Sequence, residues 1–454
     1  MTSEKPQIIT RTRRGETPVV QKFPFTRDQI PTQDASEKVV EFRQHAWEQF
    51  ELLPMPALTD EAWRRTDLHG LITDGLRIPA RGAYLDLAPL PDQLLKPMAD
   101  GEHAGEVILM PGGSKTSLAE ELVQKGVVFT DIRTAEQRYP AILDRFMAKA
   151  MVKPEAGKFA ALSLALANTG MLLYIPRGVV IEQPLHSLLW APGVGLAHIS
   201  NVLVWLEDGA SATLVHESSS PTENGQSMHA GTVEIYVGQD ASLHFVELQS
   251  FGEHMYNFTH ERVQVADNGN LDWVFGAIGG RLTKNFSDLD LVGRGASGRM
   301  SGFYFTEHHQ HLDYDSQQNH LAPNTTSDLL FKGALIDQSR AVWQGMIYVA
   351  PEAQKTDGYQ ANRNLILSHE ARADSIPGLE ILADDVRCTH GATVGKIDNE
   401  QVFYLRSRGI EKVEAERLIV EGFFEPIMQR IPFEGVRQRF QEAIHTKMAS
   451  YLGL

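Results

Sequence analysis

The sequence has almost no cysteine. Cys388 is the single thiol in 454 residues. One thiol cannot form an intrachain disulfide, and it cannot by itself complete a tetrahedral thiolate metal site. A disulfide-stapled secreted fold is therefore excluded, and we expect a reducing, cytoplasmic compartment.

Long hydrophobic runs are also missing. No apolar segment approaches the roughly 18 residues that a membrane-spanning helix needs. The first 20 residues contain an arginine pair but no apolar core behind it, so we expect no secretory signal. With 42% hydrophobic and 22% charged residues, the composition is that of a globular protein. A chain of 454 residues is long enough for two or three domains.

Basic residues are outnumbered by acidic ones. The 42 Lys and Arg residues face 58 Asp and Glu residues, which gives a formal net charge of −16. Binding to a phosphate backbone or to an anionic membrane surface depends on clustered positive charge. We therefore expect neither a nucleic acid nor a membrane as a partner.

The sequence lacks the motifs of common enzymes. The segment "MPGGSK", which begins at Met110, does not have the Gly-Lys-Ser/Thr spacing of a P-loop. No G-x-G-x-x-G motif follows a strand, and neither G-x-S-x-G nor H-E-x-x-H occurs. We predict that this chain binds no nucleotide and carries no self-contained catalytic site.

The first third of the sequence, residues 1–155, has a helical pattern interrupted by proline-rich joins. Ser117 and Glu120 have the spacing of a capping box for a short helix that would end at Gly126. Within residues 35–53 the apolar side chains recur at helical spacings and form one stripe, which comprises Val39, Val40, Ala46, Trp47 and Phe50. We therefore predict a mainly helical N-terminal region.

From about Gly157 the hydrophobic period changes from 3.6 to 2, and a strand-turn-strand unit recurs through residues 156–405. One small residue follows the polar turn in successive units, at intervals of 31, 28 and 27 residues: Ala210, Ala241, Gly269 and Ala296. Such a unit buries little alone, so successive units should stack. The near absence of helical pattern excludes βαβ winding. A β-solenoid fits best, and a β-sandwich is the alternative.

The helical period returns in residues 406–454. In the first part of this region the apolar positions predict an amphipathic helix, and they are Val413, Leu418, Ile419, Phe423 and Ile427. The last helix places Val436, Phe440, Ile444 and Met448 four residues apart, along one face. Two interpretations remain open for these C-terminal helices. They pack on each other and cap the last turn of the solenoid, or their apolar stripe is a docking surface for another protein.

One histidine cluster, "EHHQHLDYD", runs from Glu307 to Asp315. On a strand, His309, His311 and Asp313 would share a face, and His308 would point away from it. These side chains could bind a metal ion, or they could form an ordinary polar strand surface. The sequence leaves both interpretations open.

Cys388 and His390 form a second candidate site, within "DDVRCTHGATVG". In an extended segment, residues two apart project to the same side, about 7 Å from each other. A thiolate and an imidazole suit iron, zinc or an iron–sulfur unit, but they make only half of a coordination shell. Either another chain supplies the other ligands, or the pair is a buried thiol beside a hydrogen-bonded histidine.

The stretch "LEILADDVRCTHGATVGKIDNEQVFYLRSRGI" closely resembles the signature region of the SufB/SufD family, which serves iron–sulfur cluster assembly in the SUF system. The segments "DEAWRRTDL", "YIPRGVVIEQPL" and "KTDGYQANRNLILS" resemble further blocks of the family in the same order, so the resemblance covers nearly the whole chain. SufB-like sequences tend to carry C-E-H-E-A-T and additional cysteines. This chain has C-T-H-G-A-T and one cysteine, which favours the SufD branch.

The resemblance implies a right-handed parallel β-helix flanked by helical N- and C-terminal regions. It also implies a non-catalytic scaffold in a complex with SufB and two copies of the ATPase SufC, which would hydrolyse the ATP. The β-helix edge near the signature would pair with SufB. His390, with Cys388, would lie at a transient nascent cluster that SufB completes. The C-terminal helices would hold SufC, through a region that includes Phe423, Ile427, Phe440 and Ile444.

Three questions stay open on the sequence. The isolated chain can form a homodimer or pair only with SufB, because exposed strand edges pair either way. A SufB-like scaffold that accepts sulfur on Cys388 is one alternative function. A carbohydrate-active β-helix enzyme, with carboxylates along a solenoid groove, is another.

Overall fold

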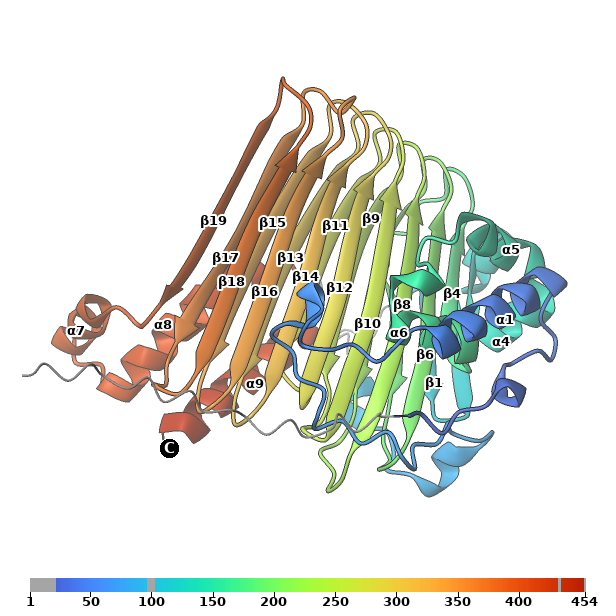
Figure 1. Cartoon of the computed structure of the whole chain (residues 1–454). Helices are drawn as coiled ribbons and strands as arrows, with labels where there is room; N and C mark the ends of the chain where they lie inside the picture. Colours follow the sequence, from blue (N-terminus) through green and yellow to red (C-terminus); the bar gives the residue numbers. More distant parts are fainter. Residues whose placement is uncertain (1–21, 96–102, 432–433, 453–454) are drawn as a thin grey trace, which may run out of the picture.

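The computed structural model describes residues 22–95, 103–431 and 434–452. The first 20 residues, on which the expected absence of a secretory signal depends, lie outside the described residues. The chain forms a parallel β-solenoid of about eight turns, with helices at both ends of the sequence (Figure 1). The predicted solenoid is confirmed, and the β-sandwich alternative is wrong.

The solenoid consists of two facing sheets, one of ten strands and one of nine. From the strand Thr169–Ile175 onward the chain alternates between the two sheets, so that successive strands lie in different sheets. All pairings among these strands are parallel, in both sheets.

The ten-stranded sheet contains, in spatial order, β19 (Arg387–Gly395), β17 (Asp357–Ile366), β15 (Thr326–Leu335), β13 (Ser297–Thr306), β11 (Asn270–Ala277), β9 (Ser242–Ser250), β7 (Ser211–Ser219), β5 (Leu185–Trp190), β1 (Gly105–Met110) and β2 (Gly113–Leu118). The nine-stranded sheet contains β18 (Arg372–Ile381), β16 (Arg340–Val349), β14 (His311–His320), β12 (Leu282–Leu291), β10 (Met255–Val265), β8 (Ser227–Val237), β6 (Ala197–Leu206), β4 (Thr169–Ile175) and β3 (Val128–Asp131).

The recurring unit of the sequence is one turn of the solenoid. The first residues of successive odd strands are in register. Ser211 pairs with Ser242, Ser242 with Asn270, and Asn270 with Ser297. The four small residues of the repeat precede these positions and are all buried. At most of these corners, the residue two positions before the start of the strand has a left-handed backbone conformation. The residues with this conformation are Gly209, Asp240, Asn268, Gly295, Asn324 and Lys355. Gly, Asn and Asp adopt this conformation at little cost, which explains the polar turns of the repeat.

N-terminal helices cover the outer face of the nine-stranded sheet. α1 (Glu37–Leu52) and α6 (Lys158–Leu166) pack side by side, and Phe159 stacks on Phe258 of β10 with ring centroids 3.7 Å apart. The predicted stripe of α1 is confirmed except for Val40, which is half-buried. The predicted capping box is wrong, because Ser117 belongs to β2 and α3 begins after Ala119 without a side-chain cap.

The remaining helices of this region are short, and they are η1 (Arg27–Gln29), η2 (Glu61–Trp63), η3 (Ala83–Asp86), α2 (Asp92–Leu95), α3 (Glu120–Gln124), α4 (Ile132–Arg138), α5 (Pro140–Lys149) and η4 (Pro154–Ala156). Strands β1 to β3 also lie in residues 1–155 and extend both sheets. The division of the chain at 155 and 405 stays a prediction.

C-terminal helices cover the outer face of the other sheet. These are α8 (Lys412–Met428) and α9 (Glu434–Leu452), whereas α7 (Asn399–Ser407), which precedes them, packs against α8. Phe303 of β13 meets Phe424 of α8 and Phe440 of α9 edge to face, with ring centroids 6.0 and 5.6 Å apart. The predicted ladder on α9 is confirmed as its buried face. These helices pack along the sheet, so the expectation that they cap the last turn is wrong (Figure 1). Among the described helices, none is long and apolar enough to cross a membrane.

Candidate functional site

The solenoid is open at its C-terminal end. β18 and β19 are the last strands of their sheets, and within the described ranges no strand pairs with the free edge of either (Figure 1). Most of β19 is exposed, and so are apolar side chains of the same end, including Leu379 and Val394. A long edge strand with free N–H and C=O groups is a template for pairing with another chain. Both predicted ligands lie on this strand.

Cys388 lies near the start of β19 and points toward the solenoid interior. Its side chain packs against a small apolar group that includes Ile347 and Ala353. The strand below offers Gly358 in register, and a Cβ there would lie 3.3 Å from the Cys388 sulfur. The Cys388 thiol therefore occupies the space left free by Gly358, which has no side chain. Burial raises the pKa of the Cys388 thiol, and the charge of Asp357 raises it further.

His390 projects to the same side as Cys388, because the two residues are two apart on one strand. It is exposed, and its register partner on β17 is Gln360, which is fully buried. The Gln360 amide crosses the interior and donates to the carbonyl of Gly378 on β18, at 2.8 Å. Gln360 thus ties the two sheets together directly beneath the imidazole. His390 stands at the rim of the open end, with a fixed support below it and solvent above.

A buried histidine lies on the far side of Gly358 from the solvent. The same Cβ that would approach the thiol would lie 3.4 Å from Nε2 of His320. The His320 ring is held by the hydroxyls of Thr325 at 2.7 Å and Ser327 at 2.8 Å. Burial lowers the pKa of His320 to about 4, so the ring is neutral at physiological pH. It provides no positive charge that would favour a thiolate at Cys388.

His320 and Gln360 were not predicted from the sequence. A signal existed in the repeat, because aligning successive units places Gly358 opposite Cys388 and Gln360 opposite His390. Gln360 comes from a strand about 30 residues away and His320 from one still further away, where local spacing gives no information.

The four predicted docking residues of the C-terminal helices have different environments. Ile427, Phe440 and Ile444 are buried against the ten-stranded sheet, at 0–2% exposure. Phe423 is half-buried, and its backbone carbonyl accepts a hydrogen bond from Lys332 at 2.7 Å. The buried three hold the helices on the solenoid, so any role in binding a partner would be indirect.

Exposed aromatic side chains occur instead on α7, none of whose residues was among the predicted docking residues. Phe403 is 74% exposed and Tyr404 is 55% exposed. α7 protrudes beyond the sheet at the same end of the molecule as β19 (Figure 1). These two rings are the most accessible apolar surface of the C-terminal helices described.

The histidine cluster does not form the predicted shared face. His309 lies in the turn before β14, so it is not on a strand with His311 and Asp313. His311 and Asp313 both bond to the hydroxyl of Thr66, and Asp313 forms a buried ion pair with Lys284 at 3.0 Å. These two side chains fasten the N-terminal segment to the sheet. The interpretation of His309, His311 and Asp313 as a metal site, one of the two that the sequence left open, is therefore wrong.

Comparison with known proteins gives two adjoining family matches. The model described as "SUF system FeS cluster assembly, SufBD core domain" matches residues 191–423, and "SufBD protein N-terminal region" matches residues 20–186. Curated relatives include the "Iron-sulfur cluster assembly SufBD family protein" of Staphylococcus aureus strain USA300 and that of Staphylococcus epidermidis. Each is 31% identical over 318 residues, which are 70% of this chain and 68% of the relative. A third, from Staphylococcus aureus strain MRSA252, is 30% identical over the same length.

Proposed function

The chain belongs to the SufBD family of iron–sulfur cluster assembly proteins, and we propose that it is the SufD-type, non-catalytic scaffold subunit of a complex with SufB and SufC. The observation that carries this proposal is the position of His390. It is exposed, with Cys388 on the same face, on the last strand of the solenoid, whose outer edge pairs with no strand within the described residues. The family membership favours assembly over the carbohydrate-active alternative.

Pairing with SufB would occur at the open end. β18 and β19 have 10 and 9 residues, and both have a free edge. A similar solenoid in SufB would continue the sheets across the interface, so that its own side chains approach His390 and Cys388. Two ligands from this chain would then be completed by ligands from SufB, which supports a transient iron–sulfur cluster shared between the two chains.

The two candidate ligands would have unequal roles. A thiol whose pKa is raised by burial is protonated at neutral pH, and a protonated thiol is a poor ligand and a poor nucleophile. The imidazole of His390 is exposed at the open end. We therefore infer that His390 is the principal ligand and that Cys388 contributes less. The same argument counts against the SufB-like alternative, in which Cys388 accepts sulfur.

SufC would dock on the C-terminal helices and hydrolyse ATP there. The buried face of α8 and α9 would transmit the position of the helices to the sheet, and the exposed Phe403 and Tyr404 of α7 would contact the ATPase. Rearrangement of the SufC copies would then change the relative position of the two solenoids and open or close the shared site.

The test is the iron and sulfide content of the complex co-expressed with SufB and SufC. We expect His390→Ala to lose most of the cluster while the three chains still co-purify. Thr389→Ala is the matched control, because Thr389 is exposed on the same strand but points to the opposite side. Cys388→Ser should retain more cluster than His390→Ala.

An unchanged cluster content in the His390→Ala complex would contradict the proposed site and leave the chain as an organiser of SufB and SufC. A persulfide on Cys388 after incubation with a sulfur donor would favour the sulfur-accepting alternative, and its absence would support the SufD-type assignment.

A further inference from the structure

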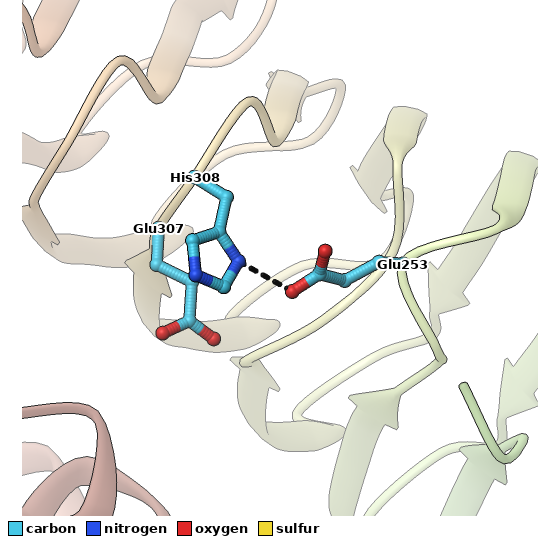
Figure 2. Close-up of side chains that lie close together, drawn as sticks. All are labelled: Glu253, Glu307 and His308. Carbon is cyan, nitrogen blue, oxygen red and sulfur yellow. Dashed lines mark hydrogen bonds and ion pairs between the residues drawn. The ribbon is translucent and has the colours of Figure 1, made fainter. Parts of the chain in front are cut away.

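A second group of potential metal ligands lies far from the open-end site. The side chains of Glu253, Glu307 and His308 offer ligand atoms that all lie within 4.8 Å of one another, and no other such group occurs in the described part of the chain (Figure 2). Glu253 comes from the loop between β9 and β10, and Glu307 and His308 come from the loop between β13 and β14. These loops lie on the edge where the odd strands end, whereas Cys388 lies near the start of an odd strand.

The loop that carries His308 is held in one conformation. Gln310 closes the turn, because its backbone N–H donates to the carbonyl of Glu307 at 3.0 Å, and its side-chain oxygen accepts from the Glu307 N–H at 3.1 Å. His308 has a left-handed backbone with φ of 52°, and its N–H donates to Asp337 in the next turn of the solenoid at 2.9 Å. Non-glycine residues are uncommon in this conformation, and histidine is among the types that adopt it most readily. The ring is thus presented toward Glu253 by the fold itself.

The three side chains differ in their access to solvent. His308 and Glu253 are 55% and 42% exposed, and His308 Nδ1 lies 2.6 Å from a Glu253 oxygen. Glu307 is only 16% exposed and forms an ion pair with Lys447 of α9, which is 11% exposed. The cluster therefore has an open side at the imidazole and a shielded side at the last helix.

We propose that Glu253, Glu307 and His308 bind a divalent transition-metal ion, with water completing its coordination. One imidazole and two carboxylates are ligands that Zn²⁺, Fe²⁺, Mn²⁺ and Co²⁺ accept, whereas Mg²⁺ and Ca²⁺ favour oxygen ligands alone. The three ligands come from two loops that lie two turns apart in the solenoid, and they are already close together before an ion binds. This site is independent of the cluster function proposed above, because no ligand is shared.

Lys447 would compete with the ion. Its ammonium group pairs with the same Glu307 carboxylate that the metal needs, so binding exchanges one positive charge for another. Loss of this pair would remove one of the contacts that hold the end of α9, where Met448 is buried and the Tyr451 hydroxyl donates to the carbonyl of Leu367. The metal would thereby weaken one contact between the C-terminal helix and the solenoid.

The test is titration of the full chain with Co²⁺, whose visible absorption reports its ligands. Cys388→Ser is used as the parent, so that the single thiol cannot contribute. We expect one Co²⁺ per chain, and at least a tenfold loss of affinity in Glu253→Gln and in His308→Asn. Asn tolerates the left-handed backbone, so the second variant keeps the turn. His309→Asn is the matched control, because His309 is the exposed neighbour outside the cluster.

The same titration on Lys447→Met tests the competition. Removal of the competing ammonium should tighten Co²⁺ binding about fivefold, the equivalent of roughly 1 kcal/mol for one partly exposed ion pair. Equal Co²⁺ affinity in the parent, Glu253→Gln and His308→Asn, or saturation by Ca²⁺ in preference to Co²⁺, would overturn the site. Unchanged affinity in Lys447→Met would overturn the exchange with α9. Circular dichroism of each variant confirms that it is folded.

Discussion

The two ends of the solenoid solve the problem of a free sheet edge in opposite ways. At the N-terminal end the last strands are antiparallel to their neighbours. β2 is a six-residue strand with an exposed lysine, and β3 has only four residues, all buried. Short strands and edge lysines are common devices against pairing. At the other end β18 and β19 are long and parallel to their neighbours, and within the described residues no strand pairs with their outer edges. The difference indicates that one end is built to terminate the sheet and the other to continue it.

The largest expected effect is a difference in unfolding free energy between core substitutions at the two ends. Leu173 of β4 is fully buried, so Leu173→Ala should lower the free energy of unfolding by about 3 kcal/mol. Leu379 of β18 is 36% exposed, and Leu379→Ala should cost the isolated chain less than about 1 kcal/mol. Urea denaturation measures both. An equal loss would mean that the open end is already covered in the isolated chain, as in a homodimer.

Acid should destabilise the chain partly through the buried His320 near the open end. Its pKa is lowered to about 4 by burial, and in the unfolded chain it is near 6.5. Below pH 6.5 the unfolded state binds more protons, so stability falls as the pH falls toward 4. Between pH 7 and pH 5 this group should cost about 2 kcal/mol. His320→Asn should reduce the measured difference in unfolding free energy by that amount, and an unchanged difference would show that His320 is protonated in the folded chain.

A charge on the free edge should convert the open end into a terminating one. Val394 is 49% exposed on β19, so Val394→Lys should leave the unfolding free energy within about 0.5 kcal/mol. It should nevertheless weaken pairing with SufB at least about tenfold, since a lysine would be desolvated at the interface. Thr116→Lys on the exposed β2 is the control at the closed end. Equal effects of the two variants on pairing would contradict the comparison.

The smallest effect should come from α7. Phe403→Ser removes a ring that is 74% exposed, so stability should change by less than about 0.5 kcal/mol. Binding of SufC should weaken about fivefold, the equivalent of about 1 kcal/mol for one partly buried ring at an interface. Surface plasmon resonance against SufC measures this difference. An unchanged affinity would move the ATPase contact away from α7.

The sequence predicted those features that depend on local period. The solenoid followed from alternating strands and the in-register small residues, and the buried face of α9 followed from four residues spaced four apart. For α8 the prediction was partly wrong. Leu418 was assigned to the apolar face but is 37% exposed, while Val420 and Phe424 are buried. α8 is apolar on several sides, and only contact with the sheet selects which side is buried.

The environment of the candidate site was beyond the sequence for a related reason. Strand geometry alone predicts that Cys388 and His390 project to the same side of the strand. Their contacts with Gly358 and Gln360 depend on stacking of one turn on the next, which brings together residues about 30 apart in the chain. The group of Glu253 and His308 joins positions two turns apart. Period indicates which side a residue faces, but not which neighbour it meets.

The uniform corners have a consequence for the size of the molecule. Because the same left-handed position recurs with the same register, the strand pairing can continue in register across an inserted or deleted turn. Each turn adds about 4.8 Å, the spacing between hydrogen-bonded strands. The distance between the closed N-terminal end and the open C-terminal end can therefore change, in evolution or by design, only in steps of one turn.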